Sequence, residues 1–291
     1  MTESNDHGLV VLAGTGASFT TPTLSALTIS DSGLNGFYLS ANGAAASLSG
    51  ATVSDLSVSG SGDHGVYVYA AAAGSITNAS LDEVTIEDSG VDGLHMEATA
   101  TGSTISGASL TDIDVGDSGG MGAYLLATTN ASAITTPTLA RISVHDSTLD
   151  GMRLHSAGVG SALTGASLSD VSIEDSLDYG LYLYASSSGA FSAKVENSTA
   201  TNNLQYGVFV DDDTTGAFTA DLGGGALGGT GGNRIFNNLL QDIRADMDNG
   251  QLKAEGNWWG STTGLSASES ILDGTSTVSY THLTLPTNRE V

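Results

Sequence analysis

The sequence DSGVDGLHMEA, from Asp88 to Ala98, combines a polar turn, a glycine and a segment in which apolar and polar residues alternate. Related segments recur along the chain, and each carries a glycine at the same place: Gly36, Gly65, Gly93, Gly122, Gly151, Gly180 and Gly207. Successive glycines in this series are 27 to 29 residues apart. A repeat of this length is typical of stacked structural units that contact only their neighbours. We therefore expect one elongated repeat domain.

Each repeat contains three short apolar segments. The first has two apolar positions two residues apart, such as Leu94 and Met96, and the second has one, such as Ile105. The third follows the pattern Leu-x-x-Ile/Val-x-Ile/Val, as in the stretch from Leu168 to Ile173. Alternation with a period of two and many β-branched residues predict strands, and the Gly, Ser, Asn and Asp residues between them predict turns. The sequence predicts an all-β solenoid of about eight coils, each of 27–29 residues with three short strands.

This pattern resembles the right-handed parallel β-helix of the pectin-lyase-like superfamily over roughly residues 5 to 260. The segment 233–260, which ends in Asn-Trp-Trp-Gly, is similar to the final coils of bacterial β-helix proteins. The resemblance implies a parallel β-helix over residues 1–260, with the last coil closed near Trp258 and Trp259. It does not imply one activity, because the same fold serves enzymes, adhesins and phage tailspikes.

The ends of the sequence do not follow the repeat in the same way. Gly8 lies 28 residues before Gly36, so we expect the sequence to begin in the middle of a coil, as a fragment of a longer protein. Residues 261–291 are expected to form a tail. Within it, residues 279–291 match no repeat position, and we interpret them as non-native, with a natural linker as the alternative.

The composition limits the classes of partner. The sequence has 7 Lys and Arg residues against 32 Asp and Glu residues, for a formal net charge of −25. Such a surface repels nucleic acids and anionic membranes. No apolar run reaches about 18 residues, so we expect no membrane span. The absence of cysteine excludes disulfides and thiolate metal sites. The acidic, lysine-poor composition resembles that of halophilic proteins.

Two columns of outward residues follow each glycine, and stacking would place both on one face of the rod. The first face column contains Tyr38, Tyr67, His95, Tyr124, Arg153, Tyr182 and Phe209. The second face column contains Ser40, Tyr69, Glu97, Leu126, His155, Tyr184 and Asp211. Aromatic rings beside hydrogen-bonding groups suit sugars, and polysaccharide-active β-helices bind ligand along this sheet. The candidate glycan-binding residues are Tyr38, Tyr67, Tyr69, His95, Glu97, Tyr124, Arg153, His155, Tyr182 and Tyr184. Alternatively, the stacked rings only stabilise the sheet.

Catalysis on the same face would have to use a small set of residues. The available groups are Asp63, His64, Asp92, His95, Glu97, Arg153 and His155, of which Asp63, His95 and Arg153 are the candidate catalytic residues. A lyase needs a base and cations that neutralise the uronate carboxylate, whereas the only lysines are Lys194 and Lys253. The repeats also lack the long insertions that would wall a catalytic groove.

We therefore expect a non-catalytic structural or adhesive segment of a secreted or cell-surface protein, with a glycan held along the tyrosine-rich face. A polysaccharide lyase or glycoside hydrolase, and a segment of a phage fibre, are the alternatives. No secretory signal precedes the repeats in the sequence MTESNDHG.

One column of aspartates raises the question of a metal. Asp31 shares its turn position with four residues in consecutive coils: Asp88, Asp117, Asp146 and Asp175. Stacked carboxylates repel each other, and either Ca²⁺ or high salt would offset that repulsion. The alternative is that these residues are solvated turn aspartates. We expect no cofactor and no built metal site, with Ca²⁺ as the alternative.

Overall fold

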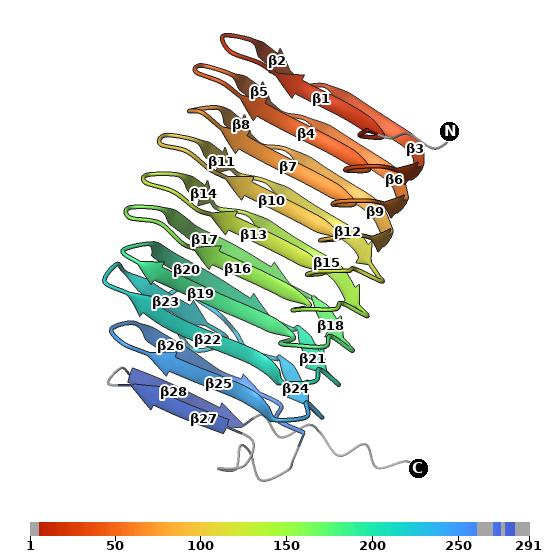
Figure 1. The fold of residues 1–291 in the computed structure, drawn as a ribbon. Coiled ribbons are helices and arrows are strands. Elements are labelled where there is room, and N and C mark those ends of the chain that lie inside the picture. The colour runs from red at the N-terminus through yellow and green to blue at the C-terminus, as the bar shows by residue number, and fades with distance from the viewer. Residues whose placement is uncertain (1–5, 261–269, 275–276, 283–291) are drawn as a thin grey trace.

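The computed structural model describes residues 6–260, 270–274 and 277–282. All regular secondary structure in these residues is β-strand. The strands stack into a rod of parallel coils, one coil above the next (Figure 1). The predicted right-handed parallel β-helix of about eight turns is thus confirmed. The described residues contain no helix that could cross a membrane.

The strands that follow the repeated glycine form a ten-stranded parallel sheet, which we call sheet 1. In order, its strands are β1 (Leu9–Ala13), β4 (Phe37–Asn42), β7 (Val66–Ala71), β10 (Leu94–Ala98), β13 (Ala123–Ala127), β16 (Met152–Ser156), β19 (Leu181–Ser187), β22 (Tyr206–Thr214), β25 (Gln241–Met247) and β27 (Ser270–Gly274). Equivalent residues pair directly: Tyr67 is opposite His95, and His95 is opposite Tyr124. Residues that share a repeat position therefore share a column.

The other eighteen strands form one bent sheet that completes each coil. One series pairs in the order β2 (Ser18–Thr20), β5 (Ser47–Ser49), β8 (Ser75–Thr77), β11 (Thr104–Ser106), β14 (Ala133–Thr135), β17 (Ala162–Ser169), β20 (Ala190–Glu196), β23 (Phe218–Asp221), β26 (Gln251–Asn257) and β28 (Thr277–His282). The second series pairs in the order β3 (Thr23–Ser32), β6 (Thr52–Ser61), β9 (Ser80–Ser89), β12 (Ser109–Val115), β15 (Thr138–His145), β18 (Ser172–Glu174), β21 (Thr199–Thr201) and β24 (Arg234–Phe236).

The core consists of like side chains stacked inside the coils. The predicted inward residues Leu94, Met96 and Ile105 are fully buried, as are their equivalents in most other coils. The repeated glycine is required by this packing. A Cβ on Gly93 would collide with the Val115 side chain and with the backbone oxygen of Gly122 in the next coil. The glycine therefore lets the corner lie directly against the core.

The aspartate column occupies a corner with an unusual backbone conformation. Asp31, Asp88, Asp117, Asp146 and Asp175 have φ angles of 55°, 54°, 48°, 55° and 56°. This left-handed region is uncommon for residues other than glycine, and Asp and Asn occupy it more readily than most. Backbone geometry is therefore one reason why aspartate recurs at this position.

Beyond residue 195 one inward column becomes polar. Ser198 takes the place that Val171 has in the preceding coil, and Asn233 and Asn257 follow it. Asn233 is 1% exposed, and its side-chain nitrogen donates to the backbone oxygens of Val195 and Leu222. The regular apolar packing is replaced here by buried hydrogen bonds.

The glycine-rich stretch 222–233 leaves the coil as an irregular loop between β23 and β24. The buried carboxylate of Asp221 accepts hydrogen bonds from the backbone N–H groups of Gly223, Gly225, Leu227 and Gly229. This one side chain thus binds four backbone groups of the loop, and Glu196 accepts hydrogen bonds from the N–H and the hydroxyl of Thr230.

Strand pairing continues past the predicted boundary at residue 260. β27 pairs with β25, and β28 pairs with β26. Trp259 is fully buried and belongs to the core. Residues 283–291, and with them most of the segment interpreted as non-native, lie outside the described residues. The proposed domain boundary and the origin of this segment stay predictions.

Candidate functional site

The outer face of sheet 1 carries the two predicted columns. The first face column forms a continuous series of ring contacts, with centroids 5.3 Å apart between Tyr38 and Tyr67 and 5.0 Å apart between Tyr67 and His95. The series continues from His95 to Tyr124 at 5.0 Å. Farther along, Arg153 lies over the Tyr182 ring at 4.7 Å from its centroid. The structure therefore brings the candidate glycan-binding residues onto one surface.

Neighbouring coils cover many of the ring faces. His155 stacks on Tyr184 at 4.4 Å, and Tyr182 stacks on Phe209 at 4.7 Å. Because these partners come from successive coils, the rings stack along the axis of the rod and direct their edges outward. Two candidate residues, His95 and Tyr182, are each only 8% exposed. This face can therefore offer ring edges and polar groups to a ligand more readily than free aromatic faces.

Several tyrosine hydroxyl groups are already hydrogen-bonded within the face. Tyr67 donates to Glu97 Oε2 at 2.6 Å, and Tyr182 donates to Asp211 Oδ2 at 2.7 Å. Burial is the main cause that raises the pKa of both phenols, and burial raises the pKa of Tyr124 to about 12. These tyrosines therefore stay protonated at neutral pH and link the two face columns.

A third column, directly before each repeated glycine, also reaches this face. Several of its side chains accept hydrogen bonds from the backbone of the next coil: Asn35 from His64 N–H, His64 from Asp92 N–H, and Asp92 from Met121 N–H. Asp150 is also in this column and was absent from the predicted set, although its position before Gly151 was visible in the repeat alignment. It accepts a bond from the Tyr179 N–H.

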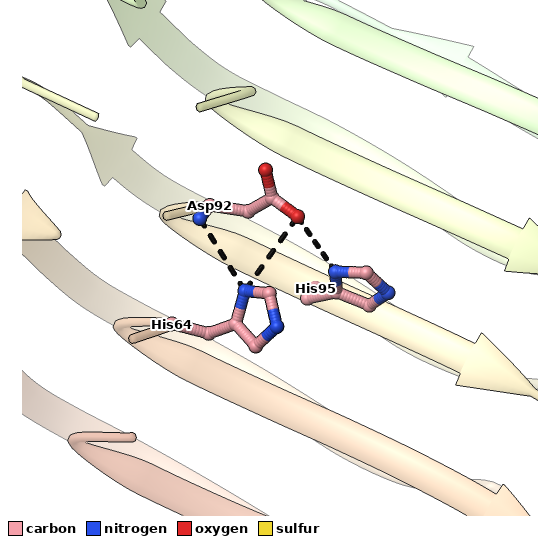
Figure 2. Close-up of side chains that lie close together, drawn as sticks. All are labelled: His64, Asp92 and His95. Carbon is pink, nitrogen blue, oxygen red and sulfur yellow. Dashed lines mark hydrogen bonds and ion pairs between the residues drawn. The ribbon is translucent and has the colours of Figure 1, made fainter. Parts of the chain in front are cut away.

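His64, Asp92 and His95 form a compact cluster where this column meets the first face column (Figure 2). Asp92 Oδ2 lies 2.7 Å from His95 Nδ1 and 3.5 Å from His64 Nδ1. The far nitrogens face two further carboxylates, with His64 Nε2 3.7 Å from Asp63 Oδ1 and His95 Nε2 3.9 Å from Glu97 Oε2. Two imidazoles thus converge on one carboxylate, and each has a second carboxylate behind it.

The charge state of this cluster follows from its surroundings. Burial alone would raise the pKa of Asp92, but the hydrogen bond from His95 and the nearby charges hold it below its ordinary value. Burial, with a smaller contribution from His95, lowers the pKa of His64. At neutral pH, Asp92 is therefore a carboxylate and His64 is a neutral imidazole.

A second polar group surrounds Arg153 in the next part of the face. Its Nε and Nη2 atoms both lie 2.6 Å from Asp150 Oδ2. Burial raises the pKa of Asp150 to about 6, although Arg153 opposes the shift. The Tyr124 hydroxyl lies 3.1 Å from His155 Nδ1, and burial, with the Arg153 charge, lowers the pKa of His155 to about 4. His155 is therefore neutral at physiological pH.

The three candidate catalytic residues do not form one centre. Asp63 lies beside His64 at the corner before β7, whereas His95 and Arg153 lie two strands apart with Tyr124 between them. The described connections on either side of the sheet 1 strands are at most seven residues long, so they add no walls to the face. The surface is open and shallow.

The predicted aspartate column lies on a different surface of the rod. Asp88, Asp117 and Asp146 line a shallow hollow along one corner, and Asp146 and Asp175 line its continuation. Within the described residues, the groups whose geometry suits a metal ion lie elsewhere. One is His64, Asp92 and His95, and the other is Glu87, Asp114 and His145 on β9, β12 and β15. Calcium binding by the aspartate column stays a prediction.

A comparison with protein families agrees with the fold. Residues 35–222 match a family model described as a right handed beta helix region. Among solved structures, the chain is similar to a mutant of the periplasmic alginate epimerase AlgG, with 14% identity, a TM-score of 0.44, and coverage of 90% of this chain and 51% of that one. It is also similar to the pectate lyase Pel9A (12% identity, TM-score 0.39, 94% and 70% covered).

A third similar structure is the A-module of the Azotobacter vinelandii mannuronan C-5 epimerase AlgE4 (11% identity, TM-score 0.34, 94% of this chain and 82% of that chain covered). The chain spans about half the length of the AlgG epimerase chain. No curated protein sequence matches it.

Proposed function

The chain belongs to the right-handed β-helix family, and on that scaffold we propose that the outer face of sheet 1 binds a polysaccharide without catalysing a reaction. The observation that carries this proposal is the unbroken series of ring and hydrogen-bonding side chains on adjacent strands from β4 to β22. Strands repeat about every 4.8 Å, a spacing comparable to the length of one sugar residue. The rod would then act as a rigid stalk in a secreted or cell-surface protein.

The free polar groups indicate how a sugar would be held. The hydroxyls of Tyr69 and Tyr184 in the second face column donate no hydrogen bond within the described part of the chain. Both tyrosines are partly exposed, and Glu97 of the next coil lies directly opposite Tyr69. Such groups recognise sugar hydroxyls by hydrogen bonds. Since the net charge is −25, a neutral polysaccharide is favoured over a polyuronate.

The test is electrophoretic retention of the protein in gels that contain a neutral polysaccharide or a polyuronate. We expect retention by a neutral polysaccharide and its loss in the variant Tyr69→Phe/Tyr184→Phe, which keeps both rings. The control is Thr85→Val, which removes an exposed hydroxyl from β9 on another sheet. No retention of the wild-type protein, or equal retention of the double variant, would show that the stacked rings serve stability alone.

A polysaccharide lyase is the second candidate, and the environment of Arg153 favours it. A neutral His155 next to the Tyr124 hydroxyl could exchange a proton with a sugar, and Arg153 could neutralise a uronate carboxylate. Arg153 is, however, already paired with the buried Asp150. Release of unsaturated uronate products that depends on His155 would replace the non-catalytic proposal with this one.

A further inference from the structure

The cluster of His64, Asp92 and His95 is arranged as a set of metal ligands. One ligand atom from each residue lies within 4.8 Å of the others. We propose that this cluster binds a divalent transition-metal ion, represented by Zn²⁺, through Nδ1 of each histidine and Oδ2 of Asp92. Two imidazoles and one carboxylate are a donor set that Zn²⁺ prefers, and such sets leave a fourth position open. The site does not depend on the polysaccharide proposal.

The distances between the donor atoms fit this assignment. With metal–ligand bonds of about 2.0–2.1 Å, tetrahedral ligands lie about 3.3 Å apart. His64 Nδ1 and Asp92 Oδ2 are 3.5 Å apart, close to that separation. His95 Nδ1 and Asp92 Oδ2 are 2.7 Å apart, because a hydrogen bond joins them. The ion would replace the proton of that bond, and the two atoms would separate by about 0.6 Å.

The remaining nitrogens supply an independent argument. His95 Nε2 is buried and has no hydrogen-bond partner within the described residues. When Nδ1 of a neutral imidazole binds a metal, its proton lies on Nε2. On His95 that proton would face Glu97 Oε2, which is 3.9 Å away and is held by the Tyr67 hydroxyl at 2.6 Å. Metal binding would thus turn this orphaned nitrogen into a donor that faces a carboxylate.

The same arrangement is present on the other side of the cluster. His64 Nε2 faces Asp63 Oδ1 at 3.7 Å, while its Nδ1 now accepts the Asp92 N–H at 3.3 Å. An ion would take over the lone pair that Nδ1 offers to this amide. Metal-bound histidines commonly donate their second N–H to a carboxylate, which fixes the tautomer and the orientation of the ring. Both histidines here have a carboxylate in that place.

The test is equilibrium dialysis of the full chain against Zn²⁺ with excess Ca²⁺, which occupies sites built only from carboxylates. We expect the wild-type protein to retain one Zn²⁺ and the double variant His64→Gln/His95→Gln to retain none. His145→Gln, from the histidine-containing cluster on the other sheet, is the matched control and should retain the ion. Bound Co²⁺ should show the intense visible absorption of a four-coordinate site in the wild-type protein only.

A second variant keeps the test decisive if the double variant does not fold. Glu97→Gln leaves all three ligands in place and should weaken Zn²⁺ binding by about 10- to 100-fold, because it removes the carboxylate behind His95. Three results would overturn the proposal: no Zn²⁺ retained by the wild-type protein, retention by the folded double variant, or an unchanged affinity in Glu97→Gln. Zn²⁺ binding without polysaccharide retention would leave the metal site intact and reject only the function proposed above.

Discussion

One inward column of the coil stack is built in two different ways. In the regular coils it is aliphatic, and beyond residue 195 it is polar. The buried aliphatic members are Leu56, Val84, Ile113, Ile142 and Val171, and the polar members are Ser198, Asn233 and Asn257. Each polar side chain accepts the N–H of the equivalent residue one coil earlier. The coils can therefore stack with either kind of contact between equivalent residues, apolar packing or hydrogen bonds.

The largest effect on stability is expected when a polar member of this column is replaced by an apolar residue. Asn233→Leu would restore the aliphatic character of the column, but it would leave the buried Ser198 N–H without its acceptor. It would also remove the hydrogen bonds that Asn233 donates to the backbone oxygens of Val195 and Leu222. We expect the free energy of unfolding to fall by about 3–5 kcal/mol, measured by urea denaturation. The exposed Asn130→Ala is the control, with a change within about 0.5 kcal/mol. A similar cost for the two variants would mean that the hydrogen bonds of Asn233 do not hold this region together.

The reciprocal change removes packing from the aliphatic half. Ile142 is 1% exposed, and Ile142→Ala should lower the free energy of unfolding by about 3 kcal/mol, because a cavity remains between coils. Ile142→Val should cost about 1 kcal/mol in the same urea experiment. If Ile142→Ala lowered the free energy of unfolding no more than Ile142→Val does, close packing would not be what stabilises the regular coils.

The pH dependence of stability should also distinguish the two regions, because the described histidines up to residue 260 all lie before residue 195. The pKa of His155 is lowered from 6.5 to about 4, so its contribution is present above pH 6.5 and is lost as the pH falls toward 4. Between about pH 7 and pH 4.5 we expect the wild-type protein to lose about 2 kcal/mol more than His155→Gln, measured by urea denaturation.

His145 provides a control of opposite sign. Burial opposes the shift, but the hydrogen bond that His145 donates to Asp146 and the neighbouring carboxylates raise the pKa of His145. Its contribution is therefore present below pH 6.5 and is lost as the pH rises through the raised pKa. If His145→Gln reduced the loss of unfolding free energy at acidic pH as His155→Gln does, the environments assigned to these two histidines would be wrong.

The smallest effect is expected in the column that lies four residues before each glycine. Ser118 Oγ is buried without a hydrogen-bond partner in the described residues, whereas Asn203, two coils farther than Ser147, accepts the Ser176 N–H and donates to Asn238. Ser118→Ala should change the free energy of unfolding by less than about 0.5 kcal/mol, whereas Asn203→Ala should lower it by about 1–3 kcal/mol, and melting temperatures would show the difference. If the two variants had equal melting temperatures, this column would not differ between the regular coils and the coils beyond residue 195.

The repeat was sufficient to predict stacked coils and the membership of the two face columns, and the resemblance to β-helix proteins supplied the right-handed form. Tyr67, His95 and Tyr124 occupy equivalent repeat positions, so their alignment on sheet 1 followed from the parallel stacking. The change at Ser198 was also visible, as a polar residue in an aliphatic column.

The details of the site could not be predicted in the same way. Whether the residue before each glycine reaches the face depends on the corner geometry. The contacts of Asp150 with Arg153 and of His64 with Asp92 could therefore not be predicted from the sequence. The stacking of ring on ring depends on side-chain rotamers, which the repeat does not determine. As a result, His95 and Tyr182 are nearly covered although their positions face outward.

The register of sheet 1 has a consequence for how such a protein can change through gene duplication. Each coil from β4 to β22 brings its own residue to each face column and its own glycine to the corner, so a coil can be copied or deleted without altering the interior of the others. Every such event would move the groups beyond it by one strand spacing, about 4.8 Å. The separation between the His64 cluster and Arg153 can therefore change only in whole steps, and the order of coils in the gene is the order of chemical groups along the rod.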